Sequence, residues 1–113
     1  MTSKEDAFVD IDVGYSKIEI LVFNTKGSCL KSFTLSENCI SPGAFTVVLT
    51  KAIALLKQSF DINFINISIP GTLDHDKRRV QSFKCLPGWS DVPLADWLEI
   101  RLSTNVLLNK KNI

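Results

Sequence analysis

Three consecutive segments near the N-terminus most constrain the fold of this chain. Residues 7–14, 17–24 and 29–35 are rich in β-branched and aromatic residues, and apolar residues recur at alternate positions in the second and third. Only a few residues separate one segment from the next. Connections this short join antiparallel strands, because a parallel pair needs a crossover of a dozen or more residues. The chain is therefore expected to begin with an antiparallel three-stranded meander.

An amphipathic helix is expected after the meander. Ser41 suits the N-cap position, and Pro42 suits the first helical turn. Apolar side chains then recur with the helical period as far as Phe60, which predicts a helix of about five turns with one buried stripe. The stripe consists of Phe45, Val48, Leu49, Ala52, Ile53, Leu56 and Phe60.

The rest of the chain predicts two further strands and a second helix. Residues 63–71 form a β-type segment that ends at Pro70-Gly71, and its position after a helix predicts a crossover to a strand parallel to an earlier one. Residues 72–83 predict a small hairpin turning near Asp76-Lys77, and residues 105–108 a last strand.

Asp91 or Ser90 is expected to cap the second helix, because aspartate and serine side chains accept hydrogen bonds from the first helical N–H groups. One apolar face of this helix comprises Leu94, Trp97, Leu98 and Leu102.

Length and charge favour one compact domain, residues 1–113, without nucleic-acid or membrane partners. A chain of 113 residues buries roughly two-thirds of its unfolded surface, so one hydrophobic core is feasible. The net charge of +1 gives no field that attracts nucleic acid, and the basic run 77–79 is expected to be a solvated turn. No apolar stretch approaches the roughly 20 residues of a membrane span, and the N-terminus lacks a signal-peptide pattern.

The cysteines favour a reducing compartment. Cys29, Cys39 and Cys85 are odd in number and form no Cys-x-x-Cys pair. With a single histidine in the chain, we expect no zinc site and a cytoplasmic location.

Two stretches, DVGYSKIE at residues 12–19 and the segment at residues 67–102, resemble motifs of the ROK family (repressor/ORF/kinase), which includes bacterial glucokinases. DVGYSKIE, residues 12–19, resembles the phosphate signature of the family. Residues 67–102 resemble its Gly-x-Pro-Gly segment, its hairpin, and its Gly-Trp loop with the helix behind it. The resemblance spans essentially all 113 residues in the order βββ-α-β-α-β. It implies the α/β half-domain of the ribonuclease H-like fold (actin-like ATPase and sugar kinase), a mixed sheet with helices packed on it.

The resemblance also implies a chemistry, ATP-dependent phosphoryl transfer to a hexose hydroxyl with Mg²⁺. Asp12, Gly14, Ser16 and Lys17 match the phosphate-binding positions, and Asp12 would also hold Mg²⁺ through water. Tyr15 stands where the family has a second glycine. The resemblance further implies that Gly71 and Asn109 bind the sugar.

The catalytic base of the family is not retained. After a strand like VLL the family places Glu-Asn-Asp-x-Asn, whose aspartate is the general base, whereas residues 109–112 here are NKKN. An ungapped comparison puts Lys111 at the base position, and a one-residue shift puts Lys110 there and keeps Asn109 as sugar ligand. A lysine ammonium has no lone pair to accept a proton near neutral pH.

Three interpretations follow from this departure. The chain is expected to be the N-terminal lobe of a glucokinase-like sugar kinase, truncated before the second lobe and inactive by itself. Alternatively, it is a non-catalytic module, derived from that lobe, that binds sugar or protein. A third interpretation is a half that complements a separately encoded second lobe. Apolar surface left on a single lobe is expected to cause homodimerisation or association with such a lobe.

Overall fold

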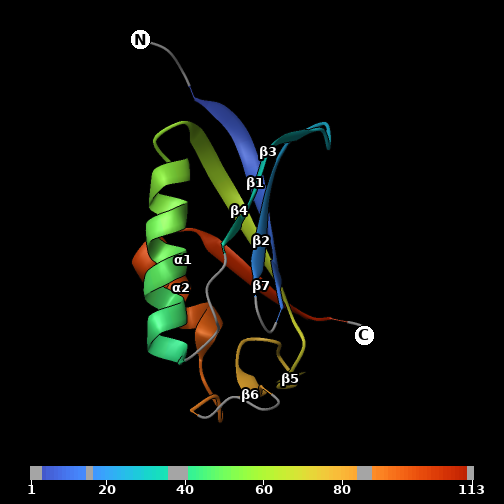
Figure 1. Cartoon of the computed structure of the whole chain (residues 1–113), viewed down its shortest axis with the longest axis vertical. Coiled ribbons are helices and arrows are strands. Elements are labelled where there is room, and N and C mark those ends of the chain that lie inside the picture. Colours follow the sequence, from blue (N-terminus) through green and yellow to red (C-terminus); the bar gives the residue numbers. More distant parts are fainter. Residues whose placement is uncertain (1–3, 15–16, 36–40, 84–87, 112–113) are drawn as a thin grey trace.

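The computed structural model describes residues 4–14, 17–35, 41–83 and 88–111 (Figure 1). In these ranges, three strands precede the first helix, three more separate it from the second helix, and one strand follows. The elements are β1 (Glu5–Val13), β2 (Ile18–Asn24), β3 (Cys29–Leu35), α1 (Pro42–Leu56), β4 (Phe60–Ile69), β5 (Thr72–Leu73), β6 (Val80–Ser82), α2 (Leu94–Leu102) and β7 (Asn105–Lys110).

Five strands form the main sheet, in the order β3-β2-β1-β4-β7. β1 pairs antiparallel with β2, and β2 with β3, which confirms the expected meander. β4 is parallel to β1, and β7 is parallel to β4, as the strand–helix–strand pattern predicts. The carboxyl ends of β1, β4 and β7 therefore lie at the same edge of the sheet.

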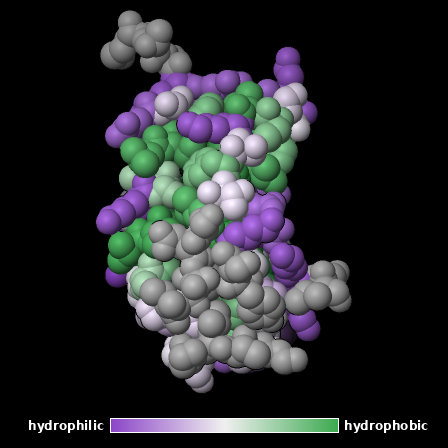
Figure 2. Space-filling view, in the orientation of Figure 1, coloured by the Kyte–Doolittle hydropathy of each residue, from purple (hydrophilic) through white to green (hydrophobic). Residues whose placement is uncertain are grey.

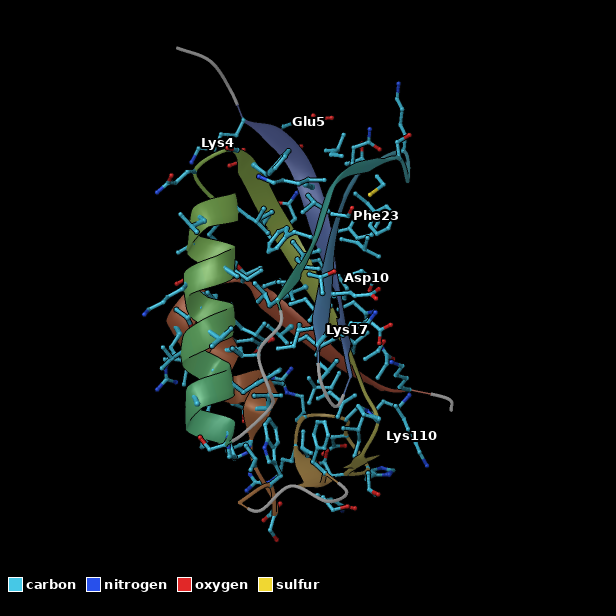
Figure 3. All side chains as sticks on the ribbon, viewed as in Figure 1. Lys4, Glu5, Asp10, Lys17, Phe23 and Lys110 are labelled. Carbon is cyan, nitrogen blue, oxygen red and sulfur yellow. The ribbon has the colours of Figure 1, made fainter. Side chains whose placement is uncertain are left out.

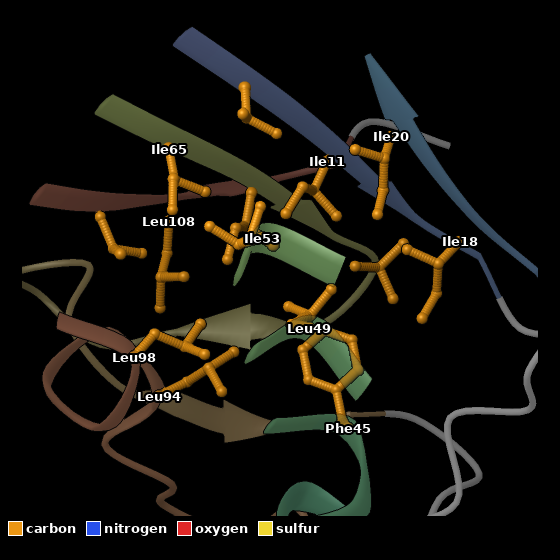
Figure 4. Close-up of a cluster of buried hydrophobic side chains, with 14 of the residues drawn as sticks. Ile11, Ile18, Ile20, Phe45, Leu49, Ile53, Ile65, Leu94, Leu98 and Leu108 are labelled. Atoms are coloured by element: carbon orange, nitrogen blue, oxygen red, sulfur yellow. The ribbon is translucent and has the colours of Figure 1, made fainter. Parts of the chain in front are cut away.

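Both helices cover the same face of the sheet (Figure 1). Figure 4 shows side chains of α1 and α2 packed against isoleucine and leucine side chains of the strands. Alternate residues of β1 and β2 point to this face and are buried, whereas their neighbours are partly exposed on the other face. Burial of each leucine or isoleucine side chain in this layer contributes about 1.5–3 kcal/mol of hydrophobic free energy relative to an exposed side chain.

The first helix is shorter than its apolar stripe predicts. Ser41 does cap it, because its Oγ accepts a hydrogen bond from the Ala44 N–H at 3.1 Å. The helix ends at Leu56 rather than Phe60, and a turn follows in which the Gln58 N–H donates to the Leu55 carbonyl at 3.2 Å. Phe60 opens β4 and pairs with Glu5 of β1, so strand pairing overrides the helical period at this residue.

The expected cap of the second helix is wrong. Pro93 is the N-cap of α2, with no side-chain cap, and neither Ser90 nor Asp91 takes that role. Asp91 has a left-handed backbone (φ 55°), and its carboxylate accepts a hydrogen bond from Arg79 Nε at 2.8 Å. The Ala95 N–H at the start of the helix donates instead to the Arg78 carbonyl at 3.2 Å.

The basic run 77–79 is not a solvated turn throughout. Lys77 lies at the turn of the hairpin with φ 56°, close to the expected position. Arg78, however, reaches α2, where its Nη2 lies 2.5 Å from both Asp96 Oδ1 and Glu99 Oε1. Its Nη1 also donates to the Val106 carbonyl in β7 at 3.2 Å. Arg78 therefore ties the β5–β6 hairpin to α2 and to the main sheet.

Apolar surface remains beside the first helix. A groove of about 470 Å³ between β3 and α1 is lined mainly by apolar side chains, among them Phe33, Leu35 and Leu55. Figure 2 shows hydrophobic surface in the upper half of the view, where Figure 1 places α1 and β3. Surface of this kind is what self-association requires, and the oligomeric state stays a prediction.

We expect Glu99→Gln to destabilise the protein by on the order of 1 kcal/mol at pH 7, and by less in acid. The Arg78 guanidinium holds the pKa of Glu99 below its ordinary value of 4.5, with a smaller contribution from the Val106 N–H, while burial opposes the shift. A pKa lowered on folding stabilises the protein above the ordinary value and no longer does so once pH falls through the folded value.

Urea unfolding of both proteins at pH 7 and about pH 3 measures this difference. Glu19→Gln is the matched control, since its pair with Lys17 is solvent-exposed, with side-chain exposures of 41% and 59%. A gap between wild type and Glu99→Gln that stays constant from pH 7 to pH 3 would contradict the role of this carboxylate.

Candidate functional site

A row of polar side chains crosses the helix-free face near the carboxyl ends of the parallel strands. Its members occupy alternate positions, so they share one face, while the helix-facing residues between them, such as Ile11, Ile67 and Leu108, are buried. The row consists of Asp10 and Asp12 on β1, Asn66 and Ser68 on β4, Asn109 on β7, and Lys111 directly after β7.

Hydrogen bonds join three members of this row across three strands. Asn66 Nδ2 donates to Asp10 Oδ1 at 2.6 Å. Asn109 Nδ2 in turn donates to Asn66 Oδ1. The three side chains are therefore held in one orientation on a rigid part of the sheet.

An ion pair closes the end of the row. Lys111 Nζ lies 2.9 Å from Asp12 Oδ1, an oxygen with almost no solvent-accessible surface. The Lys111 backbone N–H donates to the Ile69 carbonyl at 2.8 Å, which continues the pairing of β7 with β4 by one residue. The backbone thus fixes Lys111 beside the end of β4, which lies between β7 and β1, and the lysine side chain extends to Asp12 on β1.

A cleft of about 290 Å³ opens at this end of the sheet. Its charged lining residues are the two aspartates of the row, Lys111 and Lys110. Figure 3 labels Asp10 and Lys110. Open α/β sheets bind ligands outside the carboxyl ends of their parallel strands, so the position favours a binding site. The lining residues are Asp10, Ile11, Asp12, Leu21, Ser68, Lys110 and Lys111.

The expected phosphate loop contributes one described residue, Asp12, to the cleft. The Gly14 N–H donates to the Lys17 carbonyl at 2.9 Å and closes the turn between β1 and β2. Lys17 forms an exposed pair with Glu19 at 3.1 Å and is not among the lining residues. Ser16 and Tyr15 lie outside the described residues.

The two expected sugar ligands contact different parts of the fold. Asn109 belongs to the polar row and contacts Asn66, whereas Gly71 follows the end of β4 and faces the hairpin. A Cβ atom added at Gly71 would lie only 2.4 Å from the Ser82 carbonyl oxygen. Close packing of the hairpin is therefore sufficient to require glycine here, and a role in sugar binding stays a prediction.

The residues at the cleft do not fit a magnesium site. The ammonium of Lys111 contacts the carboxylate that the resemblance assigns to Mg²⁺. Within the described ranges, no three acidic, histidine or cysteine side chains gather as metal ligands. The Asp12 carboxylate is thus paired with a side-chain cation of this chain.

Sequence reasoning missed Asp10, Asn66 and Ser68. In β1 and β4 the signal is the same, two polar residues separated by one isoleucine: Asp-Ile-Asp at residues 10–12 and Asn-Ile-Ser at residues 66–68. At the end of β7, residues 109–111 are Asn-Lys-Lys, with a lysine in the middle position. Because residues i and i+2 of a strand point to the same face, the outer residues of such triplets at the ends of parallel strands are predicted to form one polar patch. The motif resemblance covers single stretches of the chain and does not include this alternation across strands.

Comparisons with known proteins show the fold. No protein-family model and no curated protein matches the sequence. Among solved structures, a ROK family glucokinase from Streptomyces griseus in complex with glucose and AMPPNP matches with a TM-score of 0.79 and 22% identity over 90% of this chain. A ROK hexokinase from Thermus thermophilus matches with a TM-score of 0.78 and 22% identity over 92% of the chain.

A ROK family transcriptional regulator, a homologue of the E. coli MLC protein, matches equally well, with a TM-score of 0.79 and 15% identity over 92% of the chain. The chain spans about a third of these proteins, 32%, 35% and 27% of their lengths. The chain therefore has a ROK-like half-domain fold, as the resemblance implied. Because kinases and a regulator share it, the fold alone assigns no activity.

The described part of the chain contains no helix long and apolar enough to cross a membrane.

We expect Gly71→Ala to destabilise the protein by about 1–3 kcal/mol, because the new methyl group collides with a backbone carbonyl that must move. Gly43→Ala is the matched control: it lies in the first turn of α1 with open space around it, and we expect a gain of about 0.5–1 kcal/mol. Thermal and urea unfolding of both variants measure the difference. Equal stabilities of the two variants would contradict the close packing of Gly71 on β6.

Proposed function

We propose that the chain is the N-terminal lobe of a ROK-type, glucokinase-like sugar kinase that binds an anionic ligand in its cleft without catalysing phosphoryl transfer on its own. One observation carries the proposal: the ammonium of Lys111 lies in the cleft, 2.9 Å from Asp12, near the position at which the resemblance expects a catalytic aspartate. Likeness in fold to a glucokinase solved with glucose and AMPPNP supports the kinase ancestry.

The side chains of the cleft favour binding over proton abstraction. A general base needs a lone pair within hydrogen-bond reach of the substrate hydroxyl, and an ammonium lacks one near neutral pH. The two carboxylates that line the cleft already have partners. Asp10 accepts the hydrogen bond of Asn66, and Asp12 pairs with Lys111. Neither carboxylate stands at the end of β7, where the resemblance expects the catalytic aspartate and this chain has lysines.

The same side chains suit the phosphates of ATP as a ligand. Lys110 and Lys111 both line the cleft, and lysine ammonium groups bind phosphate oxygens as point charges. When bound, the nucleotide would supply the phosphoryl group for transfer. The residues of this chain would hold its phosphates between the ends of β1 and β7.

We expect the chain to produce no glucose 6-phosphate above background with ATP, MgCl₂ and glucose in a coupled assay. The reason is that lysines stand where the resemblance expects the catalytic aspartate, and an ammonium cannot accept the hydroxyl proton near neutral pH. A ROK glucokinase assayed in parallel confirms that the reagents work. Turnover that rises with the concentration of this chain and disappears in Asp12→Asn would contradict the proposal.

A specific feature favours a second candidate, a sugar-binding module without enzymatic activity. Three hydrogen-bonded members of the polar row are Asp10, Asn66 and Asn109. They lie on the same open face as the aromatic rings of Phe8 and Phe23, which stack with centroids 5.3 Å apart. Amide and carboxylate groups match sugar hydroxyls, and ring faces match the apolar face of a pyranose.

For this second candidate, we expect saturable heat when glucose is titrated into the chain, and at least about tenfold weaker binding in Asn109→Ala, since one hydrogen-bonding amide is lost. Asn105→Ala, at the opposite end of β7 and exposed, is the matched control and should bind as wild type does. Absence of saturable heat, or equal affinities of the two variants, would exclude sugar binding by the polar row.

A further inference from the structure

We propose that Lys111 is a tethered cation that takes the place of a divalent metal ion on Asp12, so that this carboxylate is neutralised without a metal. The inference concerns the cation and does not depend on sugar or nucleotide binding. Its starting point is the contact between the Lys111 ammonium and an Asp12 oxygen that solvent does not reach.

Distance makes the two cations mutually exclusive. Divalent ions bind carboxylate oxygens at about 2.0–2.6 Å, and Asp12 Oδ1 already has the ammonium nitrogen at 2.9 Å. A metal ion on this oxygen would lie within a few ångströms of a like charge, where Coulomb repulsion is strong. Direct coordination of a metal ion by Asp12 Oδ1 therefore requires that Lys111 first leave.

The backbone keeps Lys111 in place. Its N–H donates to the Ile69 carbonyl at 2.8 Å, which holds the residue in register with β4. The ammonium thus starts from a fixed point and competes for Asp12 as an intramolecular ligand, at a high effective concentration that a dissolved ion has to overcome.

Charge balance supports the same conclusion. Two carboxylates, Asp10 and Asp12, and two ammonium groups, Lys110 and Lys111, line the cleft, so its formal charge is neutral without any metal. In a metal-dependent phosphate site the divalent ion neutralises both the carboxylate and the ligand. Here Lys111 neutralises the carboxylate, and Lys110, also at the cleft, is available to an anionic ligand.

Binding of Mn²⁺ alone, followed by the electron paramagnetic resonance signal of the free ion, tests the inference. We expect no saturable binding by wild type up to about 1 mM, the range of weak protein sites for divalent ions. Lys111→Met should bind Mn²⁺ at least about tenfold more tightly than wild type, because Asp12 becomes free to coordinate. The double variant Asp12→Asn/Lys111→Met should lose that binding again.

Lys110→Met is the matched control, since it removes an ammonium from the same cleft but not from Asp12, and it should bind Mn²⁺ no more tightly than wild type does. Lys111→Gln serves as a second variant, and circular dichroism confirms that each protein folds. Three results would overturn the inference: wild type that binds Mn²⁺ as tightly as Lys111→Met, no gain in either Lys111 variant, or an equal gain in Lys110→Met.

Discussion

Pairing of β1 on both of its edges is the constraint on which the rest of the structure depends. β1 is antiparallel to β2 on one edge and parallel to β4 on the other, and β7 extends the parallel part. This register aligns the carboxyl ends of three strands and assigns alternate residues to opposite faces. One face becomes the core beneath α1 and α2, and the other carries the polar row and the cleft.

Most of the fold could be predicted because its signals are local. Alternating apolar residues, short connections and one Ser-Pro helix start predict the meander, the parallel crossover and the cap at Ser41 correctly. The errors occur where a distant partner decides. Phe60 leaves the helical stripe because it pairs with Glu5, and Asp91 does not cap α2 because it binds Arg79. Neither partner is visible in the local pattern.

The candidate site could be predicted only in part, for a similar reason. Asp12, Lys110 and Lys111 were identified by resemblance to a motif, but their meeting in one cleft depends on the register between β1, β4 and β7. Gly71 shows the opposite case: a motif position whose close contact with the Ser82 carbonyl gives it a sufficient packing role. The contact between Lys111 and Asp12 joins residues almost a whole chain apart, which a motif read along the sequence does not reveal.

The polar row also has a direction. An ionised carboxylate only accepts hydrogen bonds, so Asp10 forces the Asn66 amide to present its NH₂ group to β1 and its oxygen to β7. That oxygen then requires the NH₂ group of Asn109, which turns the Asn109 carbonyl oxygen away from Asn66. A single negative charge on the central strand thus sets the donor–acceptor polarity at the edge of the sheet, two strands away, through hydrogen bonds alone.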